Sequence, residues 1–512
     1  MKKLLLSAAL LMGFSAAFAQ KGVVEKIIEI GKNDNQTTEH LYTLTSRFGG
    51  RMAGSDAYEN ALEWIASEFE EWGLEVSIEE AGEVPVGFNR GGWWGRLLGG
   101  ETAMDLHFVT PSFTSGTRGI QRGHVVIEPY STQEFETMKG TIKDAWVLVG
   151  GMNVGWAIDA SKETQEKNAE IIAKNDEISK KNREIMMNNR MNRTNEPLLE
   201  LEKVPGLFYN EMVEAGALGF VQSATTPLRA LYDKNVVKNP DMTFDKLSKV
   251  CDIKLDCHQY DKIYQMVKEY RDIELEFDIR NNFKMGPIKY NSVVGKLKGS
   301  KYPDEYIIIS GHLDAFDVAT GAVDCGVGIT PMMEVARMLT KAGAKPERSI
   351  LFIGFAAEEF GLIGAEAWCK ANADKLDGIS NVFNRDGGPT PPTGIAVPKS
   401  MVKEFEEICE PINSIHPGIP FKVTAMEPME KPKQTGGHDG TVFMVRGIPA
   451  ISFDLPDVLG YNFNYQEIWH TENDVFNNSI PEYQEHTSTV TAIVALGLAN
   501  MSKLLPRDEV YK

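Results

Sequence analysis

The chain has 512 residues, which exceeds the usual size of a single hydrophobic core, so we expect two domains. Its formal net charge of −19 at pH 7 repels polyanions and argues against nucleic acid or anionic membranes as partners. Five cysteines is an odd number, so the chain is not a disulfide scaffold.

The first nineteen residues have the pattern of a secretory signal peptide. Lys2 and Lys3 precede an apolar core over residues 4–14, and Ala17-Phe18-Ala19 forms an A-x-A cleavage site. We therefore predict a protein exported through a cleaved signal peptide over residues 1–19 to the periplasm or the medium. No other run approaches the eighteen or so apolar residues that cross a bilayer, so we expect no membrane insertion.

Residues 20–105 are predicted to be the first part of the main domain. Apolar residues at helical spacing predict a helix over residues 59–72, and LEVSIEE at 74–80 predicts an edge strand. The Gly- and Trp-rich residues 82–105 are interpreted as a linker or a loop near a cleft. Within this stretch, Trp93 and Trp94 either pack a domain junction, which is the more ordinary role, or line a substrate pocket.

Residues 106–284 change to short strands and turns, which predicts a second, β-rich domain inserted into the first. Within it, residues 161–196 are highly polar, with Ile171, Ile178 and Ile185 at seven-residue intervals. So narrow an apolar stripe favours an exposed helical arm over a coiled coil. A solvated insertion is the default interpretation, and the alternatives are an arm that covers a cleft or reaches a partner subunit in a homodimer.

Residues 285–512 return to the main domain, where three apolar runs lead into metal-ligand residue types. The run 306–310 leads to His312, the run 350–357 to Glu358 and Glu359, and the run 379–383 to Asp386. Asp324 lies in the Gly-rich turn between the first two runs, and His470 follows a strand-like segment at 448–453. Open α/β sheets bind ligands at the carboxyl ends of their strands, so these side chains are expected to converge.

The predicted ligand set matches a pair of metal ions. Two ions need one bridging carboxylate and two further ligands each. We assign Asp324 as the bridge, His312 and Asp386 to one ion, and Glu359 and His470 to the other. Imidazole with carboxylate suits Zn²⁺, although this ligand type also accepts cobalt or manganese.

Two further carboxylates have predicted catalytic roles. Asp314 follows His312 by two positions, where its carboxylate would accept the second imidazole proton and orient the ring. Glu358 is adjacent to a predicted ligand and is the natural general base. The patterns H-x-D at 312–314 and E-E at 358–359 are each common on protein surfaces. The prediction therefore depends on the joint occurrence of three apolar runs that each lead into a ligand residue type.

These residues resemble one family. GHLDAFDVATGAVDCG at 311–326, FAAEEFGLIGA at 355–365, NRDGG at 384–388 and WHTENDV at 469–475 are similar to the ligand motifs of the dizinc exopeptidases. That family includes secreted aminopeptidases and glutamate carboxypeptidases, and the resemblance is greatest to its carboxypeptidase Q (plasma glutamate carboxypeptidase) branch. The resemblance implies an α/β fold with helices on both faces of a mixed sheet, two Zn²⁺ ions and an inserted protease-associated domain, which VEAGALGFV at 213–221 resembles.

The resemblance also implies a substrate-binding segment at 436–439. In this segment His438 stands where relatives have Ser, and Asp439 follows it. Cys325 replaces a second Asp beside the bridging ligand, and Trp469 stands where some relatives have a hydroxyl donor for the oxyanion. His438 and Tyr465 are therefore the candidate oxyanion donors. Arg385 either anchors a substrate carboxylate or pairs with a neighbour, and the sequence leaves both open.

These observations predict an exported zinc exopeptidase that hydrolyses dipeptides or short peptides with an activated water and without a covalent intermediate. An aminopeptidase of the same family is the alternative, and the two differ in whether the pocket holds a free amine or a free carboxylate. A non-catalytic, receptor-like binding protein is the alternative from another class. The preferred side chain, the metal and the oligomeric state stay open at this point.

Overall fold

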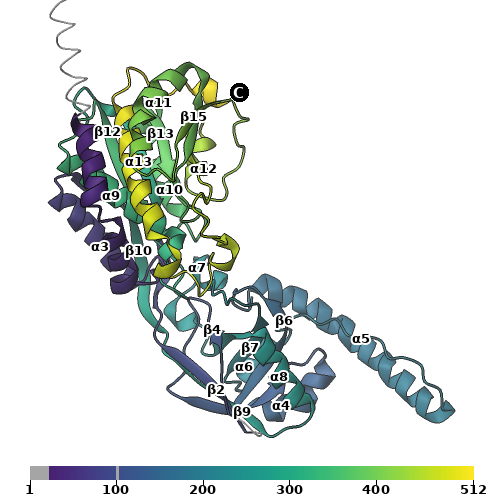
Figure 1. The fold of residues 1–512 in the computed structure, drawn as a ribbon. Coiled ribbons are helices and arrows are strands. Elements are labelled where there is room, and N and C mark those ends of the chain that lie inside the picture. The colour runs from purple at the N-terminus through teal and green to yellow at the C-terminus, as the bar shows by residue number, and fades with distance from the viewer. Residues whose placement is uncertain (1–21, 100–102) are drawn as a thin grey trace, which may run out of the picture. The chain divides into compact units, whose positions relative to one another are not determined.

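The computed structural model describes residues 22–99 and 103–512 (Figure 1). The predicted signal peptide lies outside the described residues. Within the described residues, no helix combines the length and the apolar character needed to cross a membrane.

The chain divides into two compact units. The first unit holds the chain up to Glu83, Lys289–Trp469 and Asn473–Lys512, and the second unit holds Val84–Ile288 and His470–Glu472. The second unit thus begins earlier than residue 106 and ends later than residue 284. It also includes a three-residue segment from the C-terminal part of the chain. The earlier start and the later end arise because the long strands β1 (Glu75–Asn89) and β10 (Asn282–Leu297) each contribute residues to both units.

The prediction of a linker over residues 82–105 is wrong for most of that stretch. Residues of β1 occupy its start, and Trp93–Gly99 form strand β2, which pairs antiparallel with β9 (Ile273–Ile279). Trp93 packs against the core of the second unit and its indole donates to the Phe108 carbonyl over 2.9 Å. The glycines between the apolar side chains hid this alternation from sequence inspection.

The sheet of the first unit places the strand ends where the sequence predicted them. Its order is β1-β10-β12-β11-β13, with β11 parallel to both β12 and β13, and β10 antiparallel to β12. The central strands β11, β12 and β13 are almost fully buried, as expected for continuous apolar runs. Their bounds are Tyr302–His312 for β11, Arg348–Phe355 for β12 and Ile379–Asn384 for β13.

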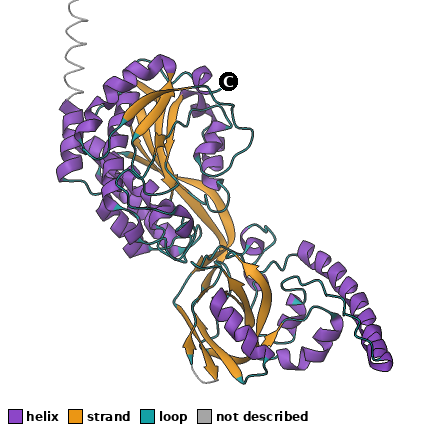
Figure 2. Cartoon of the chain, turned by 45° about the vertical axis from the view of Figure 1, so that its right-hand side comes forward, coloured by secondary structure: helices purple, strands orange, loops and turns teal. Residues whose placement is uncertain are grey.

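Helices cover both faces of this sheet, which confirms the predicted fold class (Figure 2). On one face, Trp368 of α10 and Phe443 of α12 pack against Ile308 and Ile353 of the sheet. On the other face, Phe69 of α3 packs against Phe352. The helices of this unit are α2 (Thr37–Thr43), α3 (Asp56–Glu71), α9 (Val327–Lys341), α10 (Ile363–Ala371), α11 (Val402–Cys409), α12 (Gly440–Met444), α13 (Pro481–Ala499) and α14 (Arg507–Val510), and a small sheet joins β14 (Gly394–Pro398), β15 (Lys422–Met426) and β16 (Phe453–Asp454).

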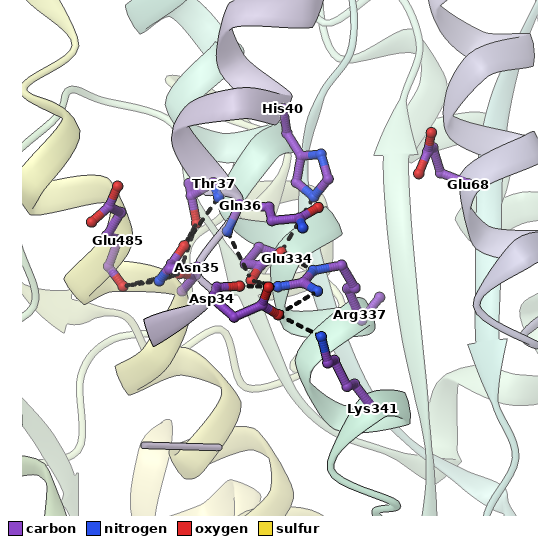
Figure 3. Close-up of polar contacts among 12 residues, drawn as sticks. Asp34, Asn35, Gln36, Thr37, His40, Glu68, Glu334, Arg337, Lys341 and Glu485 are labelled. Carbon is purple, nitrogen blue, oxygen red and sulfur yellow. Dashed lines mark hydrogen bonds and ion pairs between the residues drawn. The ribbon is translucent and has the colours of Figure 1, made fainter. Parts of the chain in front are cut away.

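A buried polar network ties the N-terminal segment to α9 (Figure 3). Glu334 has no exposed surface and receives two hydrogen bonds from the Arg337 guanidinium, at 2.7 and 2.8 Å. Arg337 also pairs with Asp34 at 3.0 Å, and His40 lies 3.2 Å from Glu334. Because α9 follows directly after the turn that carries Asp324, this network fixes the helix on which that turn depends.

The second unit is built on one eight-stranded sheet, in the order β3-β2-β9-β5-β6-β7-β8-β4. On one face, Tyr260 and Ile263 of α8 pack against Trp146 and Phe277. On the other face, α4 and α6 pack against alternate residues of the same strands. The remaining elements are β3 (Met104–Asp105), β4 (Phe108–Val109), β5 (Gln121–Ile127), α4 (Thr132–Ile142), β6 (Ala145–Asn153), α6 (Tyr209–Glu214), β7 (Gly219–Ala224), α7 (Lys234–Val237), β8 (Cys251–Asp256) and α8 (Cys257–Lys268). Its identity as a protease-associated domain stays a prediction.

The predicted arm is helix α5 (Lys162–Asn192), which extends well beyond the sheet of this unit (Figure 1). An extended return segment, residues 194–206, runs back along it. Three asparagines of α5 each use the side-chain amide to donate to, and accept from, one backbone unit of this segment, with distances of 2.8 or 2.9 Å. The pairs are Asn175 with Glu202, Asn182 with Leu199, and Asn189 with Glu196. We call this set the asparagine ladder.

Candidate metal centre

The parallel register brings the predicted ligands to one edge of the sheet. His312 is the last residue of β11 and is paired with Phe355, the last residue of β12. On the other side, Ser310 is paired with Asn384, the last residue of β13. Glu359 and Asp386 follow these strand ends within a few residues. The strand ends therefore explain why side chains so distant in sequence meet.

Four of the five predicted ligands converge at this edge. His312 Nε2 lies 3.0 Å from Asp324 Oδ1 and 3.8 Å from Asp386 Oδ1. One ligand atom each of His312, Asp324 and Glu359 lie within 4.8 Å of one another, and so do those of His312, Cys325 and Asp386. His312 and Asp324 are 1% and 4% exposed, whereas Glu359 and Asp386 are partly exposed at the edge of the group. The first unit thus contains the major part of the predicted ligand set.

The fifth predicted ligand, His470, lies in the segment His470–Glu472, which belongs to the second unit. Thr471 forms a backbone bridge with Arg229, and Glu472 accepts a hydrogen bond from the Leu228 amide over 2.9 Å. The second unit therefore determines the conformation of this segment. The role of His470 as a ligand stays a prediction.

The electrostatics of the cluster fit a resident cation. Burial lowers the pKa of His312, but Cys325, Asp314, Asp324 and Asp386 raise it well above its ordinary value. A site that stabilises a positive charge this strongly, with imidazole and carboxylate as donors, has the chemistry of a zinc site. The residues present therefore fit the metal that the sequence predicts.

Cys325 is oriented by a backbone group. Its thiol donates to the Arg385 carbonyl over 3.0 Å, and burial raises its pKa to about 11. A neutral thiol with its proton committed in this way is a neighbour of the centre, as the sequence indicated. The Asp324-Cys325 peptide bond is cis.

Asp314 acts differently from the prediction. The ring of His312 donates through Nδ1 to the backbone carbonyl of Asp314 over 2.9 Å, whereas the Asp314 carboxylate lies 3.6 Å away. The carboxylate instead accepts the backbone amides of Glu358 and Glu359, both at 3.1 Å. Asp314 therefore orients His312 through its main chain and the Glu-Glu turn through its side chain.

Glu358 lies in an environment that disfavours its charged form. Burial raises its pKa to about 10; the charge of His312 opposes this shift, and the carboxylates of Glu359, Asp386 and Asp439 add to it. Asp439 is 1% exposed, and burial again is the main reason why its pKa lies well above the ordinary value. Its Oδ1 has no hydrogen-bond partner among the described residues.

Two residues that support the centre were not predicted. Arg51 has no exposed surface, and its guanidinium donates to the carbonyls of Leu313 (2.6 Å) and Gly321 (3.0 Å), which joins the turns after β11. Asp474 accepts the backbone amides of Val323 (2.6 Å) and Asp324 (3.2 Å). Asp474 lies in the WHTENDV motif and Arg51 in the Gly-rich stretch 48–55, but partners that are backbone groups leave no signal in the sequence.

The predicted substrate-binding residues lie around this centre. A cavity of about 130 Å³ is lined by Arg385, Asp386 and His438 together with apolar side chains, among them Phe383 and Phe453. The Nδ1 atom of His438 accepts the Gly440 amide over 3.1 Å, which leaves the ring proton on Nε2.

Tyr465 lies close to the same group of acids. Its ring is near Gly388, where an added Cβ would be 3.6 Å away. Burial raises the pKa of Tyr465, and the charges of Asp324 and Asp386 add to the effect. Its hydroxyl is therefore protonated and available as a donor.

Comparisons with known proteins agree with this geometry. Residues 292–494 match the sequence model of a family described as "Peptidase family M28". The sequence is 23% identical to carboxypeptidase Q of Xenopus laevis over 95% of this chain and 91% of that protein, and 23% identical to that of Mus musculus over 93% and 88%. Among solved structures, a peptidase M28 precursor from Shewanella amazonensis has a TM-score of 0.57 at 18% identity, over 96% of this chain and 98% of that one. A zinc aminopeptidase from Bacillus subtilis has a TM-score of 0.50 at 15% identity, over 93% and 97%.

Proposed function

We propose that the chain is a member of peptidase family M28 and an exported metallo-exopeptidase that hydrolyses dipeptides or short peptides with two Zn²⁺ ions. The observation that carries the proposal is the convergence of His312, Asp324, Glu359 and Asp386 at one edge of the sheet. His470 would complete the set. Export rests on the signal-peptide pattern of residues 1–19.

Each ligand has a place in the proposed centre. Asp324 would be shared between the two ions, His312 and Asp386 would hold one, and Glu359 and His470 would hold the other. When bound, the ions polarise the scissile carbonyl and lower the pKa of a water molecule toward neutrality. Arg51 and Asp474 keep the Asp324 turn in position through its backbone.

Glu358 moves the proton of the reaction. As a carboxylate beside the predicted ligand Glu359, it would take a proton from the attacking water and return it to the leaving amine. The Asp314 carboxylate orients Glu358 because it accepts a hydrogen bond from the Glu358 backbone amide. The Nε2–H of His438 and the Tyr465 hydroxyl are the proposed donors to the oxygen on which negative charge develops.

Carboxypeptidase action is our first candidate for the direction of cleavage, because carboxypeptidase Q is the relative matched over nearly the whole chain. Aminopeptidase action is the second candidate, because the structural relatives include a zinc aminopeptidase. A receptor-like protein without catalysis is disfavoured, since the predicted base and all five predicted ligands are present in the sequence.

One assay tests both the activity and its direction. Purified protein with zinc is given a dipeptide in three forms: unmodified, N-acetylated and C-amidated. Hydrolysis of the N-acetylated form but not of the amide identifies a carboxypeptidase, and the reverse identifies an aminopeptidase. Loss of hydrolysis on chelation, with recovery on adding Zn²⁺, checks the metal requirement. A failure to hydrolyse any of the three would contradict the enzyme proposal for this substrate class.

A further inference from the structure

Arg385 is held rigidly beside the metal centre. Its Nε donates to the Val327 carbonyl over 2.9 Å, and its Nη2 donates to the carbonyls of Gly388 (3.0 Å) and Thr390 (2.8 Å). These three bonds join the start of α9 to the loop after β13. The guanidinium is therefore fixed before any ligand arrives, which reduces the entropy lost on binding.

The charge of Arg385 has no acidic partner among the described residues. The other buried arginines of α9 and β12 are neutralised: Arg337 pairs with Glu334 and Arg348 with Glu305. Arg385 adjoins Asp386 in sequence, yet no ion pair links them in the described chain. Its Nη1 also makes no hydrogen bond to the described residues. Because Arg385 is only partly buried, its Nη1 stays open to a ligand in the cavity that the residue lines.

Arg51 shows what a purely structural arginine looks like in this protein. It is 0% exposed, and its guanidinium donates to four backbone carbonyls, those of Leu313, Gly49, Thr320 and Gly321. Arg385 differs in two respects, because it is partly exposed and it lines the cavity that also contacts Asp386 and His438. That cavity, about 130 Å³, is far larger than the ~10–15 Å³ needed for one water.

We propose that the Nη1 group of Arg385 binds a carboxylate of the peptide substrate in this cavity. This inference rests on the proposed function and names its substrate class: short peptides with a free carboxylate next to the cleaved bond. The carboxylate comes either from the C-terminus or from an acidic side chain, and both present the same anion to a charge-assisted hydrogen bond. The apolar side chains of Phe383 and Phe453 line the rest of the cavity and accept the aliphatic part of that residue.

Two pairs of peptides distinguish the sources of the carboxylate with the wild-type enzyme. The first pair compares a neutral dipeptide with its C-terminal amide. The second pair compares Glu with Gln beside the cleaved bond, in dipeptides that are otherwise identical and have free ends. We expect a loss of about 10- to 100-fold in kcat/KM, mainly through KM, in one of the pairs when the carboxylate becomes an amide. Differences below about threefold in both pairs would overturn the proposal.

Variants assign the effect to the arginine. In the pair that shows the preference, Arg385→Met should make kcat/KM nearly equal for the two peptides. Arg385→Lys should keep part of the preference because it keeps the charge. Arg507→Gln is the matched control, because Arg507 also donates to backbone carbonyls (Leu376 and Asp377) but at the segment that precedes β13, the opposite end of that strand. Undiminished carboxylate preference in a folded Arg385→Met protein would overturn the assignment.

A binding measurement keeps the test independent of turnover. Calorimetric titration of the zinc-free wild-type protein with glutamate, glutamine, alanine and alaninamide should show tighter binding of the carboxylate in one matched pair. If no peptide is hydrolysed but this preference is present, the activity proposal fails and the anion site stands. If peptides are hydrolysed without any preference in kinetics or binding, the anion site fails and the activity stands.

Discussion

The first unit contains two buried groups of carboxylates with opposite electrostatics. In the network around α9, burial would raise the pKa of Glu334, but hydrogen bonds from Arg337 and His40 lower it overall. At the strand ends, burial raises the pKa of Glu358 to about 10; His312 opposes this shift, and neighbouring carboxylates add to it. Both groups contain buried carboxylates, yet only the first is neutralised by basic side chains of its own.

This difference separates a structural group from a functional one. A carboxylate whose pKa is lowered by its partners stabilises the fold and needs nothing more. A group of carboxylates whose pKa values are raised destabilises the fold at neutral pH and persists because another charge completes it. The following predictions alter one group at a time, in order of decreasing effect.

Substitution of the bridging carboxylate should have the largest effect. We expect Asp324→Ala to reduce zinc from two ions per chain to one or none and to reduce hydrolysis to background, because both ions lose a ligand. Elemental analysis after dialysis against zinc-containing buffer measures the stoichiometry. Two ions per chain in this variant would mean that Asp324 does not bridge.

Substitution of the base should preserve the metal and remove the chemistry. Glu358→Gln is expected to bind zinc normally while kcat falls by about 10³-fold or more, since general acid–base groups contribute up to ~10⁴-fold. Glu366→Gln is the control, because Glu366 is an acid on α10 that pairs with Arg446. Unchanged kcat in Glu358→Gln would exclude the proposed proton transfer.

The structural group should respond in stability instead of activity. Glu334→Gln removes a buried charge that Arg337 requires, so we expect a loss of about 3–5 kcal/mol in the free energy of unfolding. Because the pKa of Glu334 is lowered, this contribution is complete at neutral pH and lost as pH falls through the folded-state pKa. Denaturant titrations at two pH values measure it, with Glu68→Gln as control, since Glu68 accepts a hydrogen bond from neutral Trp64.

A buried acid in the second unit should show the opposite dependence on pH. Burial raises the pKa of Glu128 from 4.5 to about 7, against hydrogen bonds from Gly150, Gly206 and Tyr130. The folded state then holds a proton that the unfolded state has lost, so stability falls as pH rises from about 4.5 to 7, by up to roughly 3 kcal/mol. Hydrogen exchange of β6 amides across this range should be less pH-dependent in Glu128→Gln. A steeper dependence in the variant would contradict this explanation.

The sequence predicted the edge where the candidate ligands meet because its signal is local. Each central strand is an uninterrupted apolar run. The residues that come after these runs, His312, Glu359 and Asp386, are of types that are unusual there. Parallel pairing then converts three separate chain positions into one place. No further information was needed to predict that these side chains meet.

Other features escaped sequence inspection for definable physical reasons. Arg51 and Asp474 act on backbone groups of distant segments, and a backbone partner has no residue identity to find. The limits of the second unit were misplaced because β1 and β10 continue across them without a change in composition. On α5, the isoleucines at seven-residue spacing were noticed, whereas the asparagines at the same spacing make the contacts.

The asparagine ladder fixes how many residues of α5 correspond to how many residues of the return segment. Seven helical residues advance about 10.5 Å at ~1.5 Å each, and three extended residues advance about 10 Å at ~3.3 Å each, so every rung takes seven residues from one side and three from the other. Shortening the arm by whole rungs, seven residues of helix with three of return segment, should leave the remaining rungs aligned. Removing only one of the two stretches would put every rung beyond the cut out of step.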